Sequence, residues 1–136
     1  GSTIAGFAFG NSDVTAVHCI SESIGALYDI PHGVANSIFL PHVLSYNLPD
    51  CFVKMATLAR QTGIDEADDM TAAEFFIQNI KKLSKRLGIP LFRDLNIGKE
   101  QFDRISKMSF ENNSTPSNPR KLGQEDYLNI LENAYE

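Results

Sequence analysis

Apolar residues recur every three or four positions along most of the chain, and this spacing restricts the folds open to it. Between residues 14 and 28 one helical face would carry Val14, Val17, Ile20, Ile24 and Leu27. No stretch alternates apolar and polar residues as a half-buried strand does. The sequence therefore predicts an all-α fold, a bundle of six to seven helices forming a single domain over residues 1–136.

The same spacing places the remaining helices, and local signals suggest their ends. Asn11, Ser12 and Asp13 offer capping side chains for the helix over residues 14–28. A second helix is expected over about 32–46, with Pro41 kinking or splitting it, and a third from Pro49 to Gly63. The last two are expected over about 99–110 and 124–135, with the longest loop, 111–122, between them.

A fourth helix should start at the sequence Thr71-Ala-Ala-Glu74, which has the form of a capping box, and end at Gly88. Its expected buried face consists of Phe75, Phe76, Ile80, Leu83 and Leu87. Residues 4–9 also look helical but have no cap ahead of them. The chain is therefore expected to begin part-way through a larger protein.

Composition excludes several classes of partner. Hydrophobic residues make up 43% of the 136 positions, and the formal net charge is −5. With no basic stripe and no apolar run of about 18–20 residues, neither nucleic acid nor a membrane is an expected partner. Two cysteines, Cys19 and Cys51, make no disulfide framework, and no signal peptide pattern opens the chain. These features predict a cytoplasmic protein.

The stretch HCISESIGALYDIPHG, residues 18–33, carries the chemistry of interest. Glu22 follows His18 by four residues, so the two side chains share one helix face. His32 stands after a proline at a helix start, and Gly33 leaves room for a ligand. Imidazole and carboxylate groups can share a metal ion, but this spacing alone leaves open whether they do. His42 has no partner at ligand spacing and is assigned to packing or capping.

Three segments, AGFAFGNS, AVHCISESIGALYDIPHGVANSIFLPHVLSYN and NPRKLGQEDYLNILENAY, closely resemble the C-terminal helical domain of the iron-containing (group III) alcohol dehydrogenases. The resemblance covers nearly the whole chain and is strongest over residues 5–47. It implies that His18 and His32 are two of four metal ligands. The other two, an Asp and a His on an earlier helix of the family, have no counterpart here, nor does the family's N-terminal nucleotide-binding domain.

The function implied is the metal-binding half of an NAD(P)-linked dehydrogenase that interconverts an alcohol with an aldehyde or ketone. Fe(II) is the expected metal, with Zn(II) comparable by ligand type. The cofactor, NAD or NADP, would bind through the absent domain, so the isolated chain is expected to be inactive. The substrate is expected to be a small alcohol or aldehyde. Whether the protein forms a homo-oligomer stays open.

Glu22 departs from the family pattern, which commonly has a further histidine at this position near the nicotinamide. Three roles remain open for Glu22: an additional oxygen ligand, a proton-relay group, or a carboxylate facing water. Two alternatives to the dehydrogenase also remain. The chain could be a helical scaffold or binding domain that retains the motif without catalysis, or it could belong to a related zinc-dependent branch of the superfamily.

Overall fold

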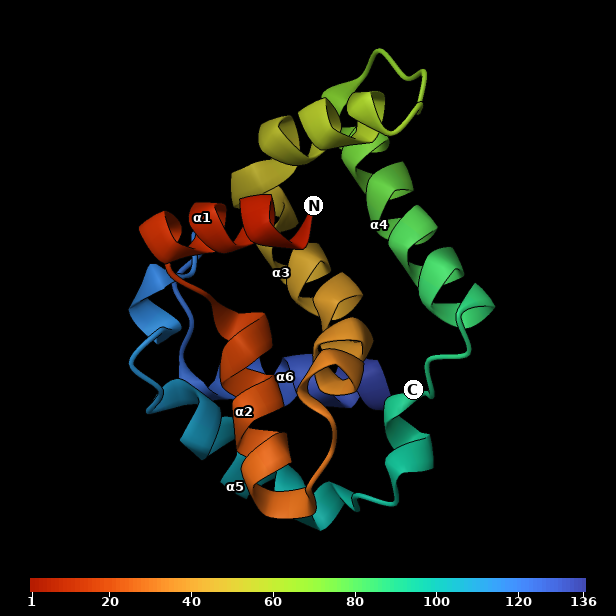
Figure 1. Ribbon diagram of the computed structural model, residues 1–136. Coiled ribbons are helices and arrows are strands. Elements are labelled where there is room, and N and C mark those ends of the chain that lie inside the picture. The colour runs from red at the N-terminus through yellow and green to blue at the C-terminus, as the bar shows by residue number, and fades with distance from the viewer.

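The computed structural model describes all residues, 1–136, and contains helices but no strands. The six α-helices, arranged as Figure 1 shows, are α1 (Ser2–Ser12), α2 (Ala16–Tyr28), α3 (His32–Gln61), α4 (Asp69–Arg86), α5 (Phe102–Phe110) and α6 (Gln124–Tyr135). Three short 3-10 helices, η1 (Phe92–Leu95), η2 (Lys99–Gln101) and η3 (Thr115–Ser117), lie between them. The all-α prediction is confirmed. None of the helices combines the length and apolar character needed to cross a membrane.

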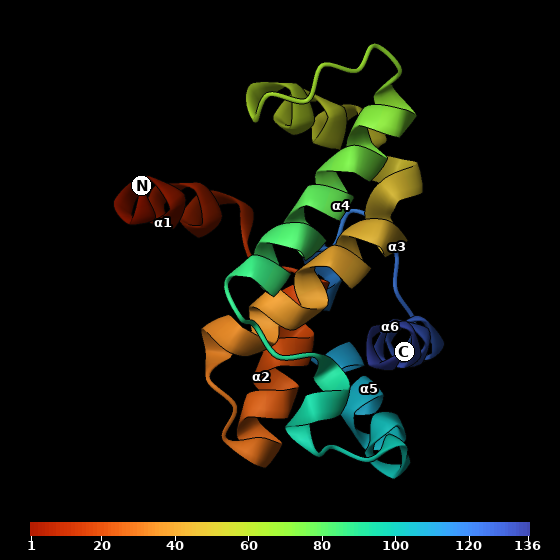
Figure 2. The same ribbon diagram turned by 90° about the vertical axis from the view of Figure 1, so that its right-hand side faces the viewer.

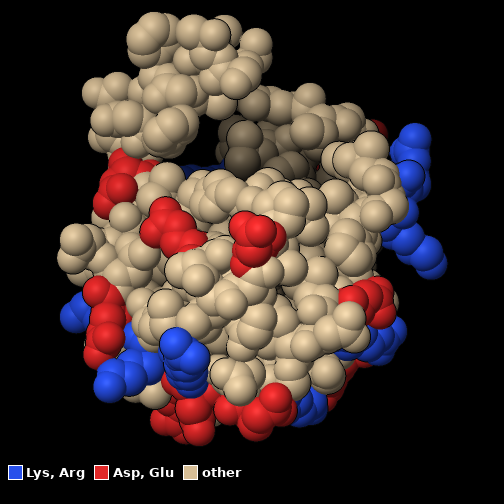
Figure 3. Space-filling model, turned by 60° about the horizontal axis from the view of Figure 1, so that its bottom comes forward, with Lys and Arg blue, Asp and Glu red and all other residues tan.

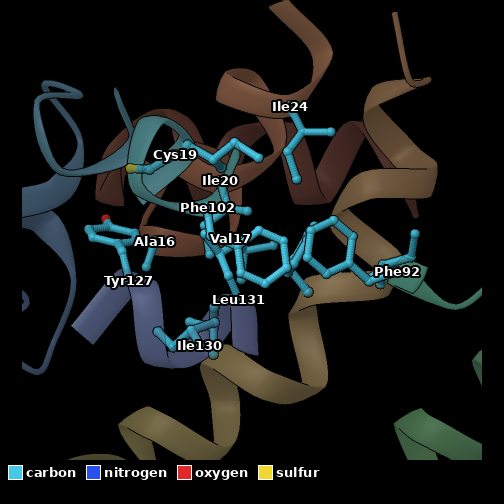
Figure 4. Packing of buried hydrophobic residues seen from close by; sticks show 14 of the residues in the cluster. Ala16, Val17, Cys19, Ile20, Ile24, Phe92, Phe102, Tyr127, Ile130 and Leu131 are labelled. Atoms are coloured by element: carbon cyan, nitrogen blue, oxygen red, sulfur yellow. The ribbon is translucent and has the colours of Figure 1, made fainter. Parts of the chain in front are cut away.

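The main core lies where α2, α3, α5 and α6 meet (Figure 4). Phe92 of η1 is fully buried in this core, and three aromatic rings lie around it. The ring centroids of Phe39, Phe102 and Tyr135 lie 4.9, 5.4 and 5.5 Å from that of Phe92. Buried aromatic rings at such separations stabilise a core beyond the area they bury. This core fixes α2 against the start of α3.

Helix α3 is a single helix of 30 residues, which corrects the prediction of two helices divided near Pro49. Pro41 and Pro49 both lie inside it. Each proline removes one backbone hydrogen bond and crowds the preceding turn. The helix continues because it packs against α2, α4 and α6 along its length, and this burial outweighs the missing bonds. Figure 1 shows the far, yellow part of α3 turning aside from the first part, so the helix is bent but not divided.

The N-cap of α4 lies three residues earlier than the predicted Thr71. This N-cap is Asp68, whose Oδ1 accepts hydrogen bonds from the backbone N–H of Thr71 at 2.8 Å and from its hydroxyl at 2.7 Å. A carboxylate at this position is favoured by the partial positive charge of the helix start. Thr71 is therefore a donor inside the first turn, and the predicted Thr71–Glu74 capping box does not form. The end is as predicted, since Gly88 follows the helix with a φ of +72°.

The buried face of α4 also differs from the prediction. Small residues and one isoleucine meet α3, namely Ala72, Ala73 and Ile77. Phe75, Leu83 and Leu87 are 48%, 51% and 68% exposed. Figure 1 shows the final turns of α4 lying apart from α3.

Helix α1 stands away from the body of the molecule (Figure 2). It buries no residue, and its Ile4, Phe7 and Phe9 are largely exposed. The helix carries no Asp, Glu, Lys or Arg, and it forms the uncharged lobe at the top of Figure 3. Its tie to the remainder of the fold is the junction with α2 at Asp13.

The aromatic centre of the core gives a direct stability prediction. Phe92→Ala should lower the free energy of unfolding by about 3–5 kcal/mol, because it removes a fully buried ring and leaves a cavity. Leu87→Ala, at an exposed position, is the matched control and should change it by less than about 0.5 kcal/mol. Urea unfolding followed by circular dichroism measures both, and equal midpoints would contradict this description of the core.

Candidate metal centre

A three-residue connection folds α3 back against α2. Asp29 takes a left-handed conformation, with φ +53°, and its N–H donates to the carbonyl of Gly25. A Cβ added at Gly25 would lie 3.5 Å from the carbonyl oxygen of Ile30, so the connection passes close to the helix it has just left. Pro31 is then the N-cap of α3. His32, the first residue of α3, therefore returns to the side of α2 that carries His18.

The two imidazole rings lie side by side, with centroids 5.2 Å apart and planes inclined at 48°. Two imidazoles bound to one tetrahedral ion, each nitrogen about 2.0–2.1 Å from it, would have centroids about 5 Å apart. A Cβ added at Gly33 would meet no atom within 4 Å, so the space beside His32 is free. The pair therefore fits two ligands of one ion. No group of three or more His, Cys, Asp or Glu residues in the chain is arranged to hold a metal.

His18 is half-buried, and His32 is exposed. Desolvation lowers the pKa of His18, the neighbouring His32 lowers it further, and the negative charge of Glu22 opposes both effects. Each of the two leading causes disfavours the protonated imidazole. A neutral imidazole is the form that binds metal ions.

The carboxylate of Glu22 is held by the loop between α5 and α6. Asn112 Nδ2 donates to Glu22 Oε2 at 2.8 Å, and Asn112 Oδ1 accepts from the backbone N–H of Ser114 at 2.9 Å. Glu22 itself is exposed. The loop thus fixes the direction of a carboxylate near His18. The sequence indicates this only through the density of Asn and Ser residues in the loop, which readily bond to nearby groups.

Asp13 ties the same loop to the junction of α1 and α2. Its carboxylate accepts from Ser117 Oγ at 2.7 Å and from Ser114 Oγ at 3.3 Å. The Ser117 bond contributes most to lowering the pKa of Asp13. The predicted capping role is wrong: α2 has Thr15 as its N-cap, with no side-chain bond to the helix. The carboxylate of Asp13 instead accepts hydrogen bonds from two hydroxyl groups of the loop, and hydrogen bonds to a charged acceptor are among the stronger ones in proteins.

Beside His18 lies a cavity of about 340 Å³ between α1, α2 and α3. Its apolar wall includes Phe9, Val17 and Leu40, and its polar wall includes His18 and Asn36. The side-chain oxygen of Asn36 is buried and has no hydrogen-bond partner. Asn36 was not singled out from the sequence, although its position four residues after His32, one helical turn along, is a signal that could have indicated it.

His42 lies apart from the histidine pair. It lines a separate crevice of about 450 Å³ between α3, the end of α4 and the end of α6. Desolvation, with a smaller contribution from the charge of Lys81, lowers the pKa of His42 to about 4. The half-buried position agrees with the predicted packing role. Both cysteines are free, as the sequence indicated.

Comparison with known proteins decides the family. The model of the Fe-containing alcohol dehydrogenase family, C-terminal part, matches residues 1–135. The chain belongs to this family. It is 39% identical to 1,3-propanediol dehydrogenase of Citrobacter freundii, over 98% of this chain and 35% of that protein. It is 33% identical to NAD-dependent methanol dehydrogenase of Bacillus methanolicus, over 96% of this chain and 35% of that protein.

A solved structure in the family gives the same picture. The crystal structure of 1,3-propanediol oxidoreductase superimposes with a TM-score of 0.92 at 38% identity, covering 96% of this chain and 35% of that one. The all-α fold described above is thus the fold of the C-terminal part of these iron-family enzymes. The chain spans about a third of the length of the relatives that it matches.

The environment of His42 predicts a measurable pH effect. The folded protein keeps this imidazole neutral down to about pH 4, whereas an unfolded histidine takes up a proton below about pH 6.5. The unfolded state then binds more protons between these values, so His42 makes stability fall as the pH drops from 6.5 to 4. Titration of the His42 ring proton by NMR checks this, and His42→Gln should weaken the pH dependence of unfolding. An NMR titration midpoint of His42 near pH 6.5 would contradict this prediction.

Proposed function

We propose that residues 1–136 are the metal-binding part of an NAD(P)-dependent alcohol dehydrogenase, with His18 and His32 as two ligands of one divalent ion. The observation that carries the proposal is the pair of rings from two different helices, 5.2 Å apart, beside free space at Gly33. Membership of the Fe-containing family supports iron as the ion, and Zn(II) suits the same ligands.

The remaining ligands and the nucleotide site would come from outside residues 1–136, in the segment that corresponds to the other two thirds of the relatives. Two imidazoles alone form an open site of low affinity, so these 136 residues by themselves would be inactive. When bound, the ion would supply Lewis acidity toward the alcohol oxygen and the nicotinamide would accept the hydride. The exposed apolar side chains of α1 and α4 would pack against the additional segment.

The residues of this chain would contribute placement and charge. His18 and His32 are held by the packing of α2 on α3, so their separation requires no rearrangement of the backbone. The apolar wall formed by Phe9, Val17 and Leu40 would exclude water from the side of the site next to His18. The substrate is a small alcohol or its aldehyde, in line with relatives named for propanediol, methanol and lactaldehyde.

Glu22 is proposed to act as a proton-relay group. Its carboxylate lies close enough to His18 to affect that residue's pKa, and Asn112 fixes its direction. A carboxylate that is held in place and open to water can pass protons between solvent and a buried site. A bond to Asn112 occupies only one of its two oxygens, which leaves the other free.

The metal assignment predicts the outcome of three histidine substitutions in the full-length enzyme. His18→Ala and His32→Ala should each remove the metal and the activity while leaving the helical circular dichroism spectrum unchanged. His42→Ala, in the separate crevice, is the matched control and should keep the metal. Iron content by elemental analysis after anaerobic purification is the measurement. Full metal content in either of the first two variants would show that the residue is not a ligand, and would favour a helical scaffold without catalysis.

The relay assignment is tested with Glu22→Gln, which keeps the shape of the side chain and removes its charge. The expected result is normal metal content, a kcat lowered by about 10²-fold or more, and loss of one limb of the pH–rate profile. Asn112→Ala, which frees the carboxylate without removing it, should lower kcat less. Reduced metal content in Glu22→Gln would make Glu22 a ligand instead, and unchanged kinetics would exclude both roles.

A further inference from the structure

One buried side-chain oxygen in the molecule lacks a hydrogen-bond partner, and it belongs to Asn36. Leaving a buried acceptor unpaired costs free energy, so such an atom in a native fold calls for an explanation. Elsewhere the buried amide groups are paired, as in the two bonds that join Asn47 and Asn118. Asn36 therefore differs from the other buried polar residues.

The position of Asn36 relates it to both histidines. It follows His32 by four residues on α3, so it lies one turn further along and on nearly the same face. It also lines the cavity beside His18. Its amide oxygen is closed to water, because almost none of that atom's surface is accessible. Bulk water therefore does not supply the missing donor, and the side chains on the same cavity wall are candidates for it.

Three other side chains on the cavity wall carry an O–H or N–H group that could donate a hydrogen bond to Asn36 Oδ1. Ser37 is already engaged, since its hydroxyl donates to the carbonyl of Gly33 at 2.7 Å. Thr15 and His18 line the same cavity, and neither side chain has a hydrogen-bond partner of its own. His18 differs from Thr15 in one respect: an imidazole that binds a metal through one nitrogen presents an N–H at the other.

We infer that Asn36 is a positioning residue for His18, its Oδ1 accepting the ring N–H that remains when His18 binds the metal. The inference rests on the proposed function. Metal-binding histidines generally donate their second nitrogen to a carbonyl or carboxylate, and this bond fixes the tautomer and the direction of the ring. A His18 ring bound in this way would present one nitrogen to Asn36, which lines the same cavity, and the other to the ion shared with His32. The lone buried oxygen is then an acceptor kept ready for the metal-bound state.

The experiment measures Zn²⁺ affinity in the full-length protein by competition with a chelator. Asn36→Leu keeps the size of the side chain and removes the acceptor, and should weaken binding by about 10- to 100-fold. Asn36→Asp keeps an oxygen at the same place and should restore affinity to within a few-fold of the parent. Thr15→Val removes the competing donor and should leave affinity unchanged.

A second readout follows the hydrogen bond itself. In Zn²⁺-loaded protein with ¹⁵N-labelled histidine, the His18 ring N–H should give a slowly exchanging resonance in the parent and in Asn36→Asp, and this resonance should be absent in Asn36→Leu. No protected His18 N–H in the parent would overturn the inference even if the variants fail to fold. Parent-like affinity in Asn36→Leu, or an equal loss in Thr15→Val, would also overturn it. Normal Zn²⁺ binding by His18→Ala would instead contradict the proposed function.

Discussion

The packing of α2 on the first turns of α3 is the constraint on which the candidate site depends. Ala16, Ile20 and Ile24 are fully buried on α2, and Ala35, Phe39 and Val43 present the matching face of α3. Only three residues connect α2 to α3, and α3 returns along α2. His18 and His32 are set by this contact, because each stands beside residues that the core holds rigidly. Side chains that are preorganised in this way can bind an ion without the loss of conformational entropy that ordering a loop requires.

A second layer of polar contacts surrounds this contact. The loop after α5 reaches back by about 90 to 100 residues, with Asn112 bound to Glu22 and Ser117 bound to Asp13. Through these bonds one loop holds both the α1–α2 junction and the Glu22 carboxylate on α2. They are exposed, so each contributes little to stability on its own. The bond from Asn112 matters for geometry, because it orients the Glu22 carboxylate beside His18.

Much of the fold could be predicted from periodicity, and the failures have physical causes. The helix predicted over about 124–135 is found at Gln124–Tyr135, and its apolar face buries Tyr127, Ile130 and Leu131. Helix α3 was divided wrongly because proline's local penalty is visible in a sequence, whereas the packing that outweighs it is not. Leu83 and Leu87 have the spacing of buried residues and are exposed, since periodicity shows that a face is apolar but not that a partner covers it.

The site was predictable in part. The resemblance to the family, rather than the spacing alone, indicated the two histidines, and the fold adds that their ring centroids lie 5.2 Å apart. Asn36 and the loop contacts were not predictable, because they depend on which atoms lack partners and on contacts between distant segments. The most direct test of the central claim is anomalous diffraction at the iron edge from crystals of the full-length enzyme, purified without air. We expect one peak about 2.0–2.2 Å from a ring nitrogen of both His18 and His32. A peak elsewhere, or one bound by only one of these rings, would contradict the shared metal site.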